Sequence, residues 1–314
     1  MASAKQDSWV KVVMRIAAVS DIHVRPGKQD DDLLNAIHER VEEISPDVFL
    51  VAGDVGSKLE ELKIALEKIR ISRALNLFVA GNHDIWFEKD KNLSSLEKYS
   101  SKIGSVCRDS GFVHLPDEPI SLDAVAFVGS IGWYDYSFRR NDLNIPHANY
   151  ERKEYRGTIW YDALAVDWEF TDYEATDLFN QKIQYDLSVI EGSVEGIIYV
   201  SHHVPFRVLI SYKDFIPWDF CSAFMGAIST GDILLEDERV LLAISGHTHI
   251  RKRGKVGGIL GITVPLGYCR PQDANLESFV NAAVADIEIR NKEITIHRHI
   301  EGDICNSISN GYSW

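Results

Sequence analysis

Short apolar runs alternate with amphipathic segments along the first quarter of the chain. The runs at residues 12–19, 48–52 and 75–80 are largely hydrophobic, which is typical of strands that are buried on both faces of a sheet. Between them, residues 30–44 and 59–71 carry apolar side chains at helical spacing. This alternation predicts a β-α-β-α-β unit, which is the pattern of a parallel sheet with crossover helices.

More strands and two more helices are predicted downstream. Strands are expected at residues 111–114, 124–129, 195–200, 240–244, 258–264, 282–289 and 293–299. The last three of these segments alternate between apolar and polar residues, which indicates antiparallel strands. Helices are expected at residues 89–110 and 172–191.

Two segments interrupt this regular pattern. Residues 133–185 are dense in Trp, Tyr and Phe and have little regular period before the helix, and residues 205–230 form a second aromatic excursion. We interpret the first segment as an insertion over the edge of the sheet, where it could act as a lid. The alternative is a surface excursion that only packs its own aromatic side chains. We expect a single domain over residues 14–314 with both insertions, after a disordered extension at residues 1–13.

Composition and charge narrow the possible partners. The 314 residues carry a net charge of −14, from 33 Lys and Arg against 47 Asp and Glu, which argues against tight, sequence-independent binding to nucleic acid. No apolar run approaches the roughly 18 residues that a membrane span needs, and no apolar stretch typical of a signal peptide occurs near the N-terminus. Four scattered cysteines without a Cys-x-x-Cys pair favour reduced thiols in a cytoplasmic protein.

Residues with metal-binding side chains follow five of the predicted strands. These residues are Asp21 and His23; Asp54; Asn82, His83 and Asp84; His202 and His203; and His247 and His249. Imidazole, carboxylate and amide oxygen are ligands for divalent ions such as Zn, Mn and Fe. Because the carboxyl ends of parallel strands lie at one edge of a sheet, we expect these side chains to meet there. They suffice for two ions, and Asp54 could bridge them because a shared carboxylate lowers the repulsion between two cations.

Each of these motifs alone has a simpler structural explanation. A strand that ends on Gly-Asp is commonly a turn, Asn and Asp favour turns and helix caps, and paired histidines occur in cores and on surfaces. The five motifs occur together, however, and each follows an apolar strand directly. This combination favours a metal site.

In this order the motifs Asp-x-His, Gly-Asp, Gly-Asn-His-Asp, His and Gly-His-x-His resemble those of the calcineurin-like metallophosphoesterase superfamily. The resemblance spans residues 21–249, which is most of the chain. It implies an α/β fold, namely a two-sheet β-sandwich flanked by helices (αββα), here with an aromatic-rich insertion. It also implies two divalent metal ions (Mn, Fe or Zn) at the strand ends.

The resemblance implies a role for each motif residue. The first ion would be held by Asp21, His23, Asp54 and His249, and the second ion by Asp54, Asn82, His202 and His247. His83 would be the catalytic histidine near the scissile ester, and Asp84 would orient it. His203 is the alternative to His202 as the ligand and would otherwise lie just outside the ligand set. The segment Gly267–Arg270 resembles a Gly-Tyr-Pro-Arg segment of some relatives, so Tyr268 and Arg270, together with Arg25, are candidate substrate-binding residues.

The implied reaction is hydrolysis of a phosphate mono- or diester by a hydroxide that bridges the two metal ions, with His83 as general acid. We expect a small-molecule or nucleotide ester as substrate, because Tyr and Trp faces in the insertion could stack on a base. A manganese-dependent nuclease of the same superfamily is one alternative, and the net charge argues against it. A non-catalytic protein-binding scaffold is another, and the complete set of ligand residues argues against it.

Overall fold

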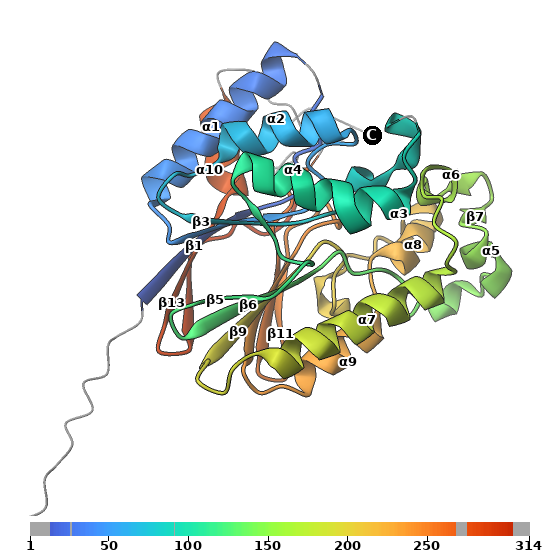
Figure 1. Ribbon diagram of the computed structural model, residues 1–314. Helices are drawn as coiled ribbons and strands as arrows, with labels where there is room; N and C mark the ends of the chain where they lie inside the picture. Colours follow the sequence, from blue (N-terminus) through green and yellow to red (C-terminus); the bar gives the residue numbers. More distant parts are fainter. Residues whose placement is uncertain (1–12, 26, 91, 268–274, 304–314) are drawn as a thin grey trace, which may run out of the picture.

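The computed structural model describes residues 13–25, 27–90, 92–267 and 275–303. Two six-stranded sheets pack face to face, and helices cover their outer faces (Figure 1). The first sheet has the strand order β14-β13-β1-β2-β3-β4. In that order, its strands are Glu293–Arg298, Ala285–Arg290, Val13–Val19, Val48–Ala52, Leu75–Val79 and Val113–His114. The predicted two-sheet sandwich flanked by helices is confirmed.

The second sheet has the strand order β11-β12-β10-β9-β6-β5. In that order, its strands are Arg253–Val256, Ile259–Thr263, Val240–Ser245, Gly196–Ser201, Val125–Ser130 and Ile120–Leu122. The inner strands of both sheets are parallel, while β13, β14, β5 and β11 pair in the antiparallel sense at the sheet edges. The five strands that carry the motifs therefore belong to two sheets, whereas the strand pattern predicts that their carboxyl ends lie at the edge of one sheet.

The strand β2 shows why the continuous apolar pattern arises. All five of its residues are buried. Phe49 and Val51 pack toward the helices, and Val48, Leu50 and Ala52 pack into the core between the two sheets. Because successive side chains point to opposite faces of a strand, a strand with both faces covered needs an apolar residue at every position.

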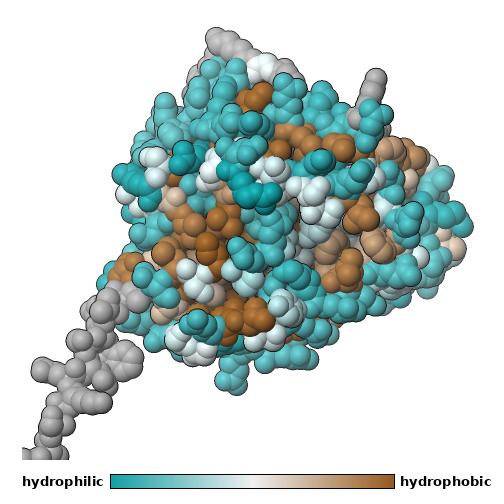
Figure 2. All heavy atoms as spheres, viewed as in Figure 1, coloured by the Kyte–Doolittle hydropathy of each residue, from teal (hydrophilic) through white to brown (hydrophobic). Residues whose placement is uncertain are grey.

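Helices cover the two outer faces of the sandwich (Figure 1). The first sheet is covered by α1 (Lys28–Ile44), α2 (Leu59–Ile69), α4 (Ile103–Ser110) and α10 (Leu276–Ala283), and the second by α7 (Asp172–Val189) and α9 (Ile228–Leu235). Figure 2 shows that the helix surfaces facing the viewer are mostly hydrophilic, whereas apolar residues gather at the open edge between the sheets. Among the described helices, none is long and apolar enough to cross a membrane.

Two predicted segments differ in detail from the structure. The helix predicted at residues 89–110 is broken into α3 (Ser95–Glu97), a π-helical turn (Lys98–Lys102) and α4. Ser94 caps the start of α3, since its side chain accepts the backbone N–H of Glu97. In addition, the short strands β5 and β11, at the two edges of the second sheet, were not predicted, because three or four residues carry too little periodic signal.

The aromatic insertion at residues 133–185 contains more regular structure than its sequence predicts. It holds α5 (His147–Glu151), a hairpin of β7 (Glu154–Tyr155) and β8 (Thr158–Ile159), α6 (Asp162–Ala165) and most of α7. The second excursion holds α8 (Ile216–Cys221) and α9. Within the insertion, the buried carboxylates of Asp162 and Asp172 each accept hydrogen bonds from several Trp and Tyr side chains.

Candidate metal centre

The ends of β1, β2 and β3 from the first sheet meet the ends of β9 and β10 from the second sheet. Backbone hydrogen bonds join these ends directly. Asp21 N–H donates to Gly53 O at 2.9 Å, and Gly246 N–H donates to His202 O at 3.0 Å. His247 contributes to the connection between the sheets, since its backbone N–H donates to the Asp21 carboxylate at 3.0 and 3.1 Å. The five predicted strand ends therefore form one site.

Two glycines of the motifs allow the strand ends to approach this closely. Gly53 has a φ of 84°, and a Cβ at this position would lie 2.6 Å from His202 Nδ1. A Cβ at Gly81 would lie 2.1 Å from the Asp54 carboxylate. Real Cβ atoms do not come so close to other atoms, so both positions require glycine.

Three groups of potential ligand atoms lie at these strand ends. Within each group the ligand atoms are within 4.8 Å of one another. The groups are Asp21, His23 and His249; His23, Asp54 and His83; and Asp54, His202 and His247. Asp54 belongs to two of them, which is the position that a bridging ligand requires.

One carboxylate oxygen of Asp54 is the centre of this arrangement. Asp54 Oδ1 accepts the backbone N–H of His83 at 2.9 Å, while Oδ2 is buried and faces imidazole nitrogens. Three imidazole Nε2 atoms surround Oδ2, at 3.2 Å in His202 and at 3.8 Å in both His23 and His83. A buried carboxylate needs a compensating positive charge, and a cation held by these imidazoles would supply it.

Hydrogen bonds to the backbone select the nitrogen that each histidine offers to this centre. His202 Nδ1 is 2.9 Å from Ala52 O, so Nδ1 carries the proton and Nε2 faces Asp54. His247 Nε2 is 3.2 Å from Phe224 O, which leaves Nδ1 as its ligand atom. In both cases the carbonyl fixes the tautomer that a metal ion needs.

Burial and neighbouring charges set the ionisation of the centre. Burial lowers the pKa of His23 and His247 well below the usual value, and nearby imidazoles add to the effect, so both rings are neutral at pH 7. Burial also opposes charge on His202, but the Asp54 carboxylate outweighs it and raises the pKa of His202 to about 9. Neutral imidazole is the form that binds metal ions, so only His202 among these three must lose a proton.

His83 lies at the more open side of the centre. Its side chain is 17% exposed, compared with 22% for His249, 7% for His23 and none for His202. Its ring stacks on Trp86, with the ring centroids 3.6 Å apart, and makes a T-shaped contact with His23 at 4.6 Å. Distance alone would allow His83 to be a ligand, and its partial exposure would also let it face substrate.

The contacts of Asp84 differ from the expected role of orienting His83. The Asp84 carboxylate accepts four backbone N–H groups, from Asp54, Val55, Gly56 and Gly81, at 2.8–3.0 Å. These donors occupy both carboxylate oxygens. Asp84 therefore joins the end of β2 to the end of β3 and shapes the loop that carries Asp54.

The other predicted site residues lie outside the three ligand groups or outside the described residues. His203 donates through Nδ1 to Ile131 O at 3.1 Å and belongs to none of the three ligand groups, although its ring lies 4.2 Å from that of His247. His202 is therefore the better candidate in the fourth motif. Arg25 is exposed. Tyr268 and Arg270 lie outside the described residues.

Sequence reasoning missed the aromatic and acidic residues behind the ligands. Asp162 accepts the side-chain amide of Asn82 at 2.9 Å, and the edge of the Trp160 ring faces His247 at 5.5 Å. Asp162 is 80 residues from Asn82 in the sequence, so no local pattern connects them. The only available signal was the aromatic density around Asp162.

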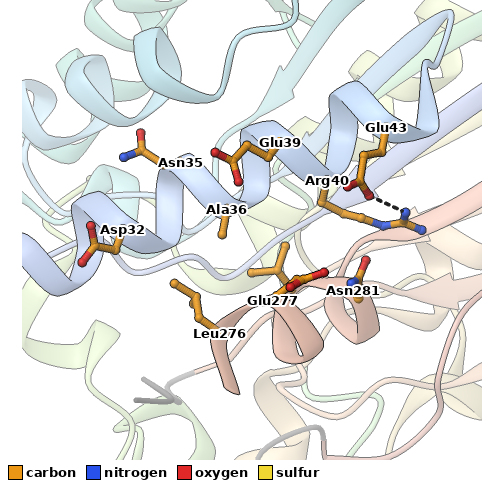
Figure 3. A pocket seen from close by; sticks show the side chains of 10 residues that line it. Asp32, Asn35, Ala36, Glu39, Arg40, Glu43, Leu276, Glu277 and Asn281 are labelled. Atoms are coloured by element: carbon orange, nitrogen blue, oxygen red, sulfur yellow. Dashed lines mark hydrogen bonds and ion pairs between the residues drawn. The ribbon is translucent and has the colours of Figure 1, made fainter. Parts of the chain in front are cut away.

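One cavity lies away from this centre. It has a volume of about 500 Å³ and lies between α1 and α10 (Figure 3). Asp32, Glu39, Glu43 and Glu277 line it with Arg40, which pairs with Glu43. None of the strand-end motifs reaches this cavity, and the metal centre remains the candidate functional site.

Comparison with known proteins agrees with the fold and identifies the family. Residues 14–251 match the family described as calcineurin-like phosphoesterase, so the chain belongs to the calcineurin-like phosphoesterase family. Proteins of this family are metal-dependent phosphoric ester hydrolases, and this chain is accordingly an enzyme of that class.

The individual relatives share less than a quarter of their residues with this chain in the matched regions. The chain is 24% identical over 264 residues to the [acyl-carrier-protein] phosphodiesterase PptH of Mycobacterium tuberculosis, and this match covers 81% of this chain and 78% of that protein. The crystal structure of that phosphopantetheinyl hydrolase superposes with a TM-score of 0.63 at 20% identity, over 81% of this chain and 89% of that one. A dimetal phosphatase from Danio rerio superposes with a TM-score of 0.53 at 15% identity, over 91% of this chain and 99% of that one.

Proposed function

We propose that this chain is a dinuclear-metal-dependent phosphodiesterase. Mn, Fe or Zn would suit the mixed imidazole and oxygen ligands. The first ion would be held by Asp21, His23, Asp54 and His249, and the second by Asp54, Asn82, His202 and His247. The observation that carries the proposal is the buried Oδ2 of Asp54 with three imidazole nitrogens within 3.8 Å.

The side chains present fit a pair of cations. The tautomers of His202 and His247 are fixed by backbone carbonyls, and the Oδ1 atom of Asn82 is buried without a hydrogen-bond partner. Two carboxylates, Asp21 and Asp54, lie inside a cluster of histidines that are neutral or can lose one proton. When bound, such ions supply Lewis-acid charge at the phosphoryl group and lower the pKa of a water molecule towards 7.

His83 would act on the leaving group. It is more exposed than His23, the other histidine in its ligand group with Asp54. The stacked Trp86 ring holds its imidazole in one orientation. From this position it would give a proton to the leaving alkoxide, a general-acid contribution typically worth about 10²–10⁴-fold. Asp84 would act indirectly, because it fixes the loop of Asp54.

A phosphodiester with an apolar or aromatic group on one side is the substrate class we favour. The named relative acts on a phosphodiester, and it matches four-fifths of this chain. The exposed ring of Tyr161 packs against Trp86 at 4.9 Å, so an aromatic surface adjoins the ring that holds His83. The net charge of −14 disfavours a nucleic-acid polymer and so argues against the nuclease alternative.

A substrate panel tests this proposal. With Mn²⁺ present, we expect bis(p-nitrophenyl) phosphate to be hydrolysed at least about tenfold faster than p-nitrophenyl phosphate, which corresponds to a preference of about 1.4 kcal/mol. Holo acyl carrier protein, a cyclic nucleotide and single-stranded DNA complete the panel. The His83→Ala variant and a chelator-treated sample control for contaminating hydrolases. Faster turnover of the monoester would refute the diester assignment, and cleavage of DNA alone would favour the nuclease.

A further inference from the structure

One buried carboxylate of the insertion contacts the proposed metal centre from behind. Asp162 begins α6 and is 3% exposed. It accepts four side-chain hydrogen bonds, from Asn82 Nδ2 at 2.9 Å, Trp86 Nε1 at 2.9 Å, Tyr134 OH at 3.1 Å and Trp160 Nε1 at 2.8 Å. Both of its oxygens are therefore occupied, and all four donors lie in or beside the site.

The contact with Asn82 decides which end of the amide faces the centre. A carboxylate accepts hydrogen bonds and donates none, so the nitrogen of the Asn82 amide must face Asp162. The oxygen then points the other way, and it is buried without a hydrogen-bond partner. The two ends of an amide have nearly the same shape, but only the oxygen binds a cation. Without an acceptor at this position, nothing in this contact would select the orientation in which the oxygen faces an ion.

We propose that Asp162 is a positioning residue that holds the Asn82 amide with its oxygen toward the second metal ion. The inference rests on the proposed function, because it assigns Asn82 to that ion. It gives the aromatic insertion a role in the centre, in addition to covering the edge of the sheet.

The same carboxylate also holds the aromatic neighbours of two histidines. Trp86 stacks on His83, and Trp160 presents its ring at 82° to His247 with the centroids 5.5 Å apart. Each indole N–H is bonded to Asp162, so neither ring can turn without breaking that bond. Asp162 thus links the insertion to a proposed ligand and to the proposed acid.

Asp172 offers a matched control within the same insertion. It is 6% exposed and accepts Trp133 Nε1 at 2.8 Å and Lys153 Nζ at 2.6 Å, together with the hydroxyl of Tyr136. None of these donors is a proposed ligand. A substitution at Asp172 therefore reports the general cost of removing a buried carboxylate from the insertion.

The test measures Mn²⁺ binding to the full chain by isothermal titration calorimetry, with no substrate present. We expect Asp162→Ala to weaken the second ion about 10–100-fold and to leave the first unchanged, since outer contacts of ligands typically contribute this much. We expect Asp172→Ala to leave both ions within about threefold of wild type, although it lowers the thermal midpoint.

A double variant tests the selection of the amide end directly. Asn82→Asp alone should weaken the second ion, because the new carboxylate would lie about 2.9 Å from that of Asp162, where like charges repel. In the Asp162→Ala background the same substitution should restore binding to within about tenfold of wild type, because either carboxylate oxygen can bind the ion. A merely structural role of Asp162 predicts no such rescue.

Several results would overturn the inference. Equal losses in Asp162→Ala and Asp172→Ala, or a double variant no better than Asp162→Ala, would show that Asp162 only supports the insertion. If Asp162→Ala fails to fold, Asp162→Leu, which has a similar size and no acceptor, replaces it with Asp172→Leu as its control, and an unchanged second ion in Asp162→Leu refutes the role. A wild-type chain that binds fewer than two ions would overturn the proposed function together with this inference. A wild-type chain that binds two ions, with Asp162→Ala unchanged, would overturn this inference alone.

Discussion

The Asp84→Asn substitution tests the interpretation of the loop that carries Asp54. The Asp84 carboxylate is 1% exposed and accepts four backbone N–H groups, two at each oxygen. An asparagine has nearly the same shape but only one acceptor oxygen. Two of the four N–H groups would therefore face an amide nitrogen, which is itself a donor.

The expected cost follows from those two lost partners. A buried donor that loses its acceptor costs about 1–3 kcal/mol, so two of them should lower the free energy of unfolding by about 2–6 kcal/mol. For a chain of this length, about 2 °C per kcal/mol corresponds to a fall in the thermal midpoint of roughly 4–12 °C. Urea unfolding in the presence of a chelator measures the effect without a contribution from bound metal.

The alternative role, in which Asp84 orients His83, predicts a different result. In that case Asp84→Asn would resemble His83→Ala, with slow hydrolysis and unchanged stability of the metal-free protein. We expect His83→Ala to unfold at nearly the wild-type urea concentration, since its side chain is 17% exposed and only the ring is removed. An Asp84→Asn protein that is slow but as stable as wild type would refute the reasoning from its hydrogen bonds.

Four further predictions address the metal centre. Asp54→Asn should abolish hydrolysis of an aryl phosphate ester and lower the bound Mn²⁺ from two ions per chain to less than one, as measured by elemental analysis; two retained ions would contradict the bridge. His83→Ala should lower kcat about 10²–10⁴-fold while keeping two ions, and loss of an ion would instead make His83 a ligand. Because Asp54 raises the pKa of His202 to about 9 in the metal-free protein, an ion must displace a proton from His202 at neutral pH. Mn²⁺ affinity at that site should therefore fall as pH falls from 9, by up to about tenfold per pH unit. Calorimetry that finds the same affinity throughout pH 6.5–8.5 would refute this. Chelator treatment should remove the activity and Mn²⁺ should restore it, with unchanged activity after confirmed metal removal as the contrary result.

The residues at the strand ends could be predicted from the sequence, whereas the side chains that surround them could not. Asp21, Asp54 and His202 directly follow buried strands, so a local apolar run points to each of them. The division of these strands between two sheets is not visible in any local pattern, because strand pairing depends on contacts distant in sequence. The same limit applies to Asp162, whose partners come from three separate segments.

Asp84 shows how a resemblance can suggest a role without showing the contacts that a residue makes. Its place next to His83 suggests a side-chain contact between neighbours, and the motif resemblance supports that idea. In the structure, three of its four partners lie 28–30 residues earlier in the chain, at the end of β2. The resemblance identified the residue, but only the coordinates show which groups it binds.

The backbone at the proposed ligands explains why such supporting contacts are needed. Asp21, His23, Asp54, His247 and His249 all have left-handed backbone angles, with φ between 48° and 69°. For residues with a side chain this conformation costs about 1–2 kcal/mol each, so the five positions together oppose folding by roughly 5–10 kcal/mol. Metal binding can offset such a cost, because its free energy adds to that of folding. Contacts within the protein offset it too. The hydrogen bonds of Asp84 to the β2 loop, and of Asp21 to the backbone of His247, act at these same turns and do not involve an ion. These contacts of the protein with itself therefore help to hold the ligand positions. The strained turns bring ligands from both sheets around one carboxylate oxygen of Asp54.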